Sequence, residues 1–137
     1  MADAGPYRFL LAIDGSQHAN RAAEYLFRRA CPLRPCEVDL IMVGPPSLVD
    51  LLTAAQRNLL LRAGKETEVA RKMLDVAGIP YRFHAELGDP AKEIVRLAGA
   101  VDCHEVVTGT RGMSALEGLT VGSVAYTVVH ESPVPVT

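Results

Sequence analysis

The sequence predicts an α/β protein built on an open, parallel, Rossmann-like sheet with helices on both faces. Short apolar runs that end in turn residues alternate along the chain with longer stretches in which apolar residues recur every three or four positions. Strands that are separated by helices pair in parallel through right-handed crossovers. The 137 residues show no linker and no internal repeat, so residues 1–137 are expected to form a single domain.

The first strand, the first helix and the second strand are expected before residue 44. The apolar run RFLLAI (residues 8–13) indicates a strand, and the sequence DGS that follows it indicates a turn and a helix N-cap. Alanines and large apolar residues then recur at helical spacing until Pro32 and Pro35 end the helix. The run VDLIMV (residues 38–43) indicates the second strand.

The middle of the chain is expected to hold a long helix, a third strand and the start of another helix. Apolar residues trace one helix face over about residues 48–77, and Gly78 is a plausible C-cap. Residues 81–87 alternate enough to form a strand near an edge of the sheet. The pair Asp89-Pro90 indicates a helix start, with Asp as N-cap and Pro at the first helical position.

The last part of the chain is expected to hold two strands and a helix. Residues 104–108 indicate the fourth strand, and a helix is expected from Ser123 onward. Residues 134–136 can form a short fifth strand.

The loop between the fourth strand and the last helix, GTRGMSALEGLTVGS, contains four glycines. Glycines can simply make a tight turn, but four of them also allow the backbone to bend around a phosphate chain with its N–H groups pointing inward. The start of the helix after Gly122 would add free N–H donors and a partial positive charge. Ser123 would add a hydroxyl group and Arg111 a cation. The loop is therefore a candidate phosphate-binding loop.

Asp14 follows the first strand, at the edge where open parallel sheets bind their ligands. In a nucleotide site its carboxylate would accept the two hydroxyl hydrogens of a ribose. The alternative is that Asp14 only caps the first helix, although Ser16 can serve as that cap. Because a second cap is available, we favour the ribose-binding interpretation.

Composition argues against several other classes of function. The net charge of −2 gives no basic surface for nucleic acid or for an anionic membrane, and no stretch is apolar for long enough to span a bilayer. The N-terminal sequence MADAGPYR lacks a leader pattern, so a cytoplasmic protein is expected. The three cysteines are expected to be reduced thiols, and the four histidines lack the spacing of a zinc site.

The glycine loop resembles a known nucleotide-binding motif. It is not a P-loop, and no G-x-G-x-x-G follows the first strand. Gly109-Thr-Arg-Gly112, nine residues, and then Gly122-Ser123 match the G-x2-G-x9-G-[ST] pattern of ATP-binding universal stress proteins. The sequences AIDGS at residues 12–16, GDP at residues 88–90 and SPVPV at residues 132–136 also resemble that family. The resemblance covers essentially the whole chain.

The resemblance implies a fold and a set of ligand contacts. The sheet would have five parallel strands in the order 3-2-1-4-5. Asp14 would contact the ribose of ATP, and main chain at two strand ends would surround the base, at Ala12, Ile13 and Val43. The ribose and phosphates would be wrapped by residues of the glycine motif and the helix after it, namely Gly109, Gly112, Gly122, Ser123 and Val124, with Arg111 at a variable position of the motif.

The resemblance also implies a function, with two alternatives. The leading expectation is a regulatory or sensing protein of the stress response that binds ATP, with AMP or ADP as alternative ligands. Mg²⁺ would be held through the phosphates, and the protein would form a homodimer through the edge that carries Val134 and Val136. The alternatives are a weak ATPase or nucleotide-handling enzyme, and a dimeric stress scaffold that binds no nucleotide. Since no paired acids accompany Glu117, at most slow ATP hydrolysis is expected.

Overall fold

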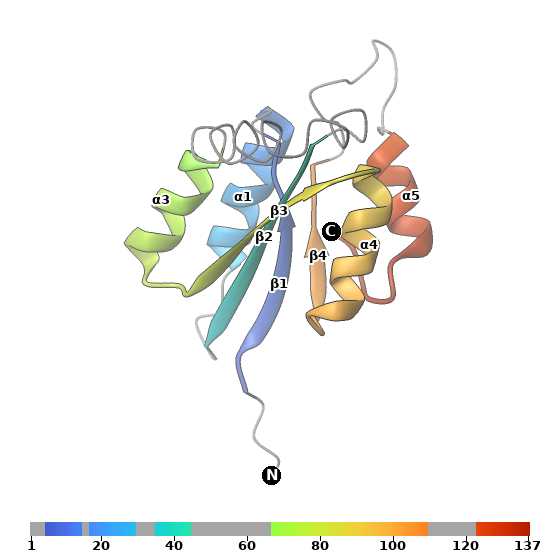
Figure 1. Cartoon of the computed structure of the whole chain (residues 1–137). Helices are drawn as coiled ribbons and strands as arrows, with labels where there is room; N and C mark the ends of the chain where they lie inside the picture. The colour runs from blue at the N-terminus through green and yellow to red at the C-terminus, as the bar shows by residue number, and fades with distance from the viewer. Residues whose placement is uncertain (1–4, 15–16, 30–34, 45–66, 110–122) are drawn as a thin grey trace.

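The computed structural model describes residues 5–14, 17–29, 35–44, 67–109 and 123–137, and within them it shows an open parallel sheet (Figure 1). Four strands pair in the order β3-β2-β1-β4. Their bounds are Tyr7–Ala12 for β1, Cys36–Gly44 for β2, Tyr81–Leu87 for β3 and Glu105–Val107 for β4. Every pairing is parallel, which confirms the predicted class of sheet.

The expected fifth strand is reduced to a single bridge beside β4. Val136 pairs in parallel with Val106, the amide of Val106 donates to the carbonyl of Pro135 at 2.9 Å, and Thr137 donates to Val106 at 2.8 Å. The described sheet therefore has four strands rather than five. Proline has no N–H group to donate to a ladder, so Pro133 and Pro135 limit how far this segment can pair.

The described helices cover both faces of the sheet, as Figure 1 shows. On one face lie α1 (Gln17–Arg29) and α3 (Glu68–Ala77), which pack against each other. On the other face lie α4 (Pro90–Ala100) and α5 (Ser123–Glu131), which also pack together. With 13 residues in the longest of them, none of the described helices qualifies as a membrane span.

Two predicted helix ends are confirmed by their backbone geometry. Gly78 ends α3 with φ of 70°, in the left-handed region where glycine is favoured, and its amide donates to the carbonyls of the last turn. Asp89 caps α4, where its carboxylate accepts the amide hydrogen of Lys92 at 3.0 Å and Pro90 follows at the first helical position. The earlier part of the predicted long helix, residues 48–66, lies outside the described residues.

The sheet separates two apolar cores. Their centres are residues of β1 and β2 that are at most 1% exposed: Phe9 and Leu40 on the α1 side, and Leu10 and Ile41 on the α4 side. The alternation of neighbouring residues between the two cores is the expected pattern for a strand buried on both faces. This burial explains why both strands are almost continuously apolar in sequence.

Each core also contains one buried acid, held by side chains of other elements. On the α1 side, Glu105 of β4 is 2% exposed and accepts hydrogen bonds from Arg29 at 2.6 Å, from Thr137 at 2.6 Å and from the hydroxyl of Tyr7 at 3.1 Å. A buried carboxylate requires such partners because its transfer from water is costly. Glu105 therefore joins α1, β1 and the C-terminal segment to β4.

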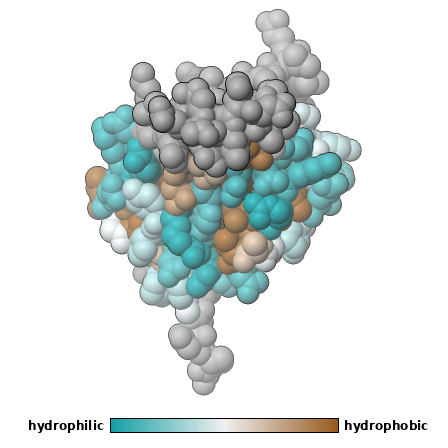
Figure 2. All heavy atoms as spheres, viewed as in Figure 1, coloured by the Kyte–Doolittle hydropathy of each residue, from teal (hydrophilic) through white to brown (hydrophobic). Residues whose placement is uncertain are grey.

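On the other face, Asp39 of β2 is 2% exposed and is held by the edge strand β3. His84 Nε2 lies 2.7 Å from its Oδ1 atom, and Arg82 Nε donates to the same atom at 3.1 Å. Arg82 and His84 alternate with apolar residues, as edge strands commonly do to avoid pairing with other chains. In the view of Figure 1, the described surface is mainly hydrophilic, with smaller hydrophobic areas between (Figure 2).

Candidate functional site

The carboxyl ends of the four strands lie at one edge of the sheet because all the strands are parallel. The connection after β1 runs through α1 on one face, and α5 follows β4 on the opposite face. The neighbouring strands β1 and β4 therefore mark the point where the strand order reverses. In open α/β sheets this switch point is the usual place for a ligand.

The first group of predicted site residues lies where β1 ends. Ala12 is the last residue of β1 and pairs with Ile41. Ile13 is 3% exposed, and its amide still donates to the carbonyl of Ile41 at 2.9 Å. Asp14 comes next and is half-buried, so its carboxyl group lies just beyond the strand at the switch point. This hydrogen bond to β2 lies one residue beyond the end of β1, and it holds the backbone next to Asp14 in place.

Val43 and Val124 approach this edge from two other elements. Val43 is half-buried near the end of β2 and pairs with Glu86 of β3. Val124 lies in the first turn of α5. Together with Ala12, both pack against the core on the α4 side. The fold thus brings together three predicted site residues from β1, β2 and α5.

The predicted phosphate loop is described at its two ends. Gly109 follows β4, and its carbonyl accepts a hydrogen bond from the hydroxyl group of Thr108 at 3.2 Å. Ser123 is exposed and begins α5. The remaining predicted residues of the loop, Arg111, Gly112 and Gly122, lie outside the described residues.

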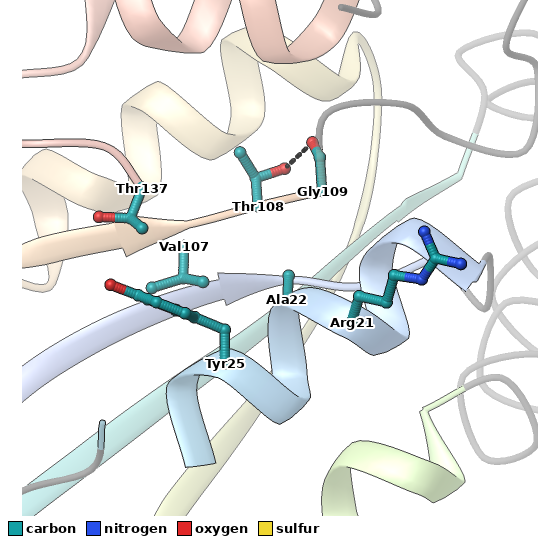
Figure 3. Close-up of a pocket in the computed structure, with 7 residues that line it drawn as sticks. All are labelled: Arg21, Ala22, Tyr25, Val107, Thr108, Gly109 and Thr137. Atoms are coloured by element: carbon teal, nitrogen blue, oxygen red, sulfur yellow. Dashed lines mark hydrogen bonds between the residues drawn. The ribbon is translucent and has the colours of Figure 1, made fainter. Parts of the chain in front are cut away.

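A pocket of about 250 Å³ opens between α1 and the end of β4 (Figure 3). Its walls come from α1, from the residues that end β4 and from the C-terminal segment: Arg21, Ala22, Tyr25, Val107, Thr108, Gly109 and Thr137. Tyr25 and Thr137 lie at one end of the pocket, and Arg21 and Gly109 lie toward the other. The first glycine of the motif is therefore also part of a cavity wall.

Sequence reasoning missed the contributions of α1 and Thr137 to this pocket. Arg21 and Tyr25 are four residues apart and so lie on one face of the helix, but this spacing did not reveal which strand they face. At the Tyr25 end, Arg29 donates to the Tyr25 hydroxyl at 3.4 Å. This hydrogen bond, together with the negative charge of Glu105, raises the pKa of Arg29 above its ordinary value. The cationic form of Arg29 is therefore favoured beside the pocket.

Protein ligands for a metal ion were not expected, and the described parts of the chain contain no group of three or more His, Cys, Asp or Glu residues placed to hold one. Cys36 and Cys103 are both buried free thiols. Burial raises the pKa of the Cys103 thiol to about 11. Cys103 is thus a protonated core side chain near neutral pH.

The fold and the position of these residues define a Rossmann-like α/β protein with a candidate ligand site at its switch point. The chain belongs to the universal stress protein family, whose model matches residues 7–137. It is similar to the universal stress protein in the QAH/OAS sulfhydrylase 3' region of Thermus aquaticus, with 34% identity over 131 residues that cover 93% of each chain.

Solved structures share the fold of this chain. The structure of the hypothetical protein MJ0577 has 25% identity, covers 95% of this chain and 92% of its own, and superposes with a TM-score of 0.84. A universal stress protein family protein from Arabidopsis thaliana with AMP bound has 18% identity, covers 96% and 90% of the two chains, and gives a TM-score of 0.70. The second similarity is evidence for the fold alone.

Proposed function

We propose that this protein binds an adenine nucleotide and acts as a regulatory or sensing protein in the stress response. The observation that carries the proposal is the position of Asp14 and Gly109, which follow the two strands at the switch point. Gly109 also begins the motif that resembles ATP-binding members of the family. A structural relative with AMP bound supports an adenine nucleotide as the ligand.

In this proposal the nucleotide lies across the carboxyl ends of three strands. The base lies near Val43 of β2 and near the main chain of Ala12 and Ile13, and Asp14 accepts hydrogen bonds from the ribose. Because the strands lie in the order β2-β1-β4, a nucleotide in this orientation would have its phosphates beyond β1, toward Gly109. Helix α5 would direct its first free amides toward the phosphates, beside Ser123 and Val124, and the loop would add Arg111, Gly112 and Gly122.

ATP is the proposed ligand, with Mg²⁺ held through its phosphates and water rather than by a protein cage. Mg²⁺ commonly keeps several waters and binds substrate phosphates. The described residues that follow β1 and β4 offer amides, hydroxyl groups and the carboxylate of Asp14, which fits phosphate and ribose better than direct metal ligation. The residues present are consistent with a nucleotide-bound Mg²⁺.

We further propose that ATP is retained much longer than it is cleaved. Backbone amides that bind the ground state accelerate hydrolysis only if they bind the transition state more strongly. Hydrolysis also needs a group that positions the attacking water, and the sequence around the motif offers Glu117 without a second acid. A turnover on the order of 1 s⁻¹ that is lost in Glu117→Gln would identify an ATPase instead.

The experiment that tests the proposed function is the analysis of what the purified protein carries. The protein is denatured, and the released small molecules are examined by ultraviolet absorbance and mass spectrometry. Protein first stripped by unfolding and refolding is then titrated calorimetrically with ATP, ADP and AMP, with and without Mg²⁺. A released adenine nucleotide or saturable heat supports the proposal. If no nucleotide is released and none of the three ligands gives heat, the proposal is wrong.

A further inference from the structure

The pocket between α1 and β4 lies at the phosphate end of the proposed nucleotide site. Three neighbouring strands, in the order β2, β1 and β4, carry the proposed site: Val43 lies near the end of β2, Asp14 follows β1 and Gly109 follows β4. A nucleotide with its base at β2 and its ribose at β1 has its phosphates at β4. The pocket lies on the α1 face of the sheet, where Ala22 and Val107 belong to the core, and it extends from Gly109 toward the C-terminal segment that pairs with β4 on the side away from β1. It is therefore placed to receive the group farthest from the base.

Among the described residues that line this pocket, Arg21 is the one with a charged side chain. Its side chain is exposed, and its guanidinium group has neither a hydrogen bond nor an ion pair with another residue that the structure describes. Its backbone is held in place because the next two residues, Ala22 and Ala23, are buried against the sheet at 8% and 3% exposure. A fixed helix position with an available guanidinium group is suited to an anion.

The remaining walls are compatible with a phosphate beside this cation. Ala22 and Val107 form a buried apolar floor, and the Thr108 hydroxyl, which donates to the Gly109 carbonyl in this structure, could donate to a phosphate only by rotating away from it. On the measure in which a single water needs about 10–15 Å³, the pocket has a volume of about 250 Å³ and so holds many times that. A phosphate can enter it together with its bound water.

We propose that Arg21 binds the terminal phosphate of ATP and so makes the site prefer ATP to AMP. This inference rests on the proposed function and adds a residue from α1, outside the glycine motif. Arginine forms two parallel hydrogen bonds to phosphate oxygens, which are stronger than bonds between neutral groups. AMP has its phosphate next to the ribose and does not reach the pocket. The contribution of Arg21 is therefore specific to nucleotides with a longer phosphate chain.

The test compares the affinities of three variants for ATP, ADP and AMP by calorimetry. Arg21→Gln is expected to weaken ATP binding by roughly 10- to 100-fold, the range for losing a charged hydrogen bond. AMP binding should change by less than about twofold. Arg21→Lys, which keeps the charge but loses the two-pronged geometry, should weaken ATP less than Arg21→Gln does. The matched control is Arg28→Gln, since Arg28 is an exposed arginine of the same helix outside the pocket.

The outcomes separate this inference from the proposed function. If wild-type protein binds no adenine nucleotide, both the proposed function and the role of Arg21 are wrong. If wild-type protein binds ATP and Arg21→Gln binds it equally well, only the role of Arg21 is wrong. Equal losses of ATP and AMP in Arg21→Gln would also overturn it, because they would place the effect at the first phosphate or in the fold. Melting curves measured in parallel establish that each variant is folded.

Discussion

The carboxylate of Glu105, buried in β4, lies 2.6 Å from the guanidinium group of Arg29 at the end of α1. The two residues differ in environment, because the side chain of Glu105 is 3% exposed and the side chain of Arg29 is 46% exposed. The same carboxylate oxygen accepts the hydroxyl group of Thr137 at 2.6 Å. One buried acid thus holds both a helix and the C-terminal segment against the strand that leads into the glycine motif.

Glu105→Gln should lower the free energy of unfolding by about 1–3 kcal/mol, because a buried carboxylate with charged and hydroxyl partners is replaced by a neutral amide. Urea denaturation measures the change. Glu37→Gln is the control, since Glu37 is a half-exposed acid whose pair with Arg8 at 3.8 Å should contribute less than about 1 kcal/mol. Equal losses in the two variants would contradict the role assigned to Glu105.

Because the pKa of Cys103 is raised, the stability of the protein is expected to fall at alkaline pH. Burial raises the pKa of this thiol from 9.0 to about 11 in the folded protein. Above pH 9 the thiol ionises in the unfolded chain but stays protonated in the folded one, which favours unfolding. Its contribution to stability is therefore complete below pH 9 and is lost as the pH rises through about 11.

Cys103→Ala tests this dependence. The stability advantage of the wild type over Cys103→Ala should be smaller at about pH 10 than at about pH 8, because only the wild type has this thiol to ionise. Both free energies of unfolding come from urea titrations, and the other titrating groups cancel in the difference. A difference that stays constant between the two pH values would show that Cys103 keeps its ordinary pKa in the folded state.

Asp14→Ala should weaken nucleotide binding by about 1–3 kcal/mol through the loss of charge-assisted hydrogen bonds to the ribose. Calorimetric titration with ATP gives the change in affinity. Asp75→Ala, which removes an exposed acid of α3 far from the strand ends, should bind ATP as the wild type does. If Asp14→Ala keeps its affinity but melts at a much lower temperature, Asp14 has only a structural role.

The C-terminal segment is expected to join two copies of the chain. In its bridge to β4, Pro135 and Thr137 direct their hydrogen-bonding groups toward β4, so by strand alternation those of Val136 face outward. Backbone groups that face outward in this way can form hydrogen bonds with a second copy of the chain in a twofold dimer. Val136→Pro removes the outward donor without removing a bond to β4.

Sedimentation velocity should therefore show a homodimer for the wild type and a monomer for Val136→Pro at the same concentration. Circular dichroism of Val136→Pro should show a folded protein. A wild-type protein that sediments as a monomer at micromolar concentration would reject the dimer. A Val136→Pro variant that stays dimeric would place the contact elsewhere.

The order of the elements was predictable from local signals, whereas the contacts between distant side chains were not. Residues 81–87 were expected as a strand near an edge, and β3 has these bounds and this position. Glu105, in contrast, is bonded to residues 98, 76 and 32 positions away, and its sequence neighbours give no sign of these partners. Periodicity reports which face of an element is buried, but it does not report what lies across the interface.

In the candidate site, too, positions that follow from local sequence signals were predictable and contacts between distant elements were not. Asp14 and Gly109 were expected at the carboxyl edge because they follow predicted parallel strands, and the structure places them there. Arg21 and Thr137 were not expected to line a pocket together with Gly109, because this arrangement arises from the packing of α1 and of the C-terminal segment against β4. The expected fifth strand was wrong in extent, since prolines limit its ladder to one bridge.

The central claim is that an adenine nucleotide binds at the carboxyl edge of the sheet, and a nuclear magnetic resonance titration of the labelled protein with ATP and Mg²⁺ tests it most directly. The account predicts saturable changes in the amide signals that follow β1 and β4 and that begin α5, with Asp14, Gly109, Ser123 and Val124 among them. Residues at the opposite edge of the sheet, such as Tyr7, should change little. The absence of saturable changes, or changes centred on that opposite edge, would contradict the account.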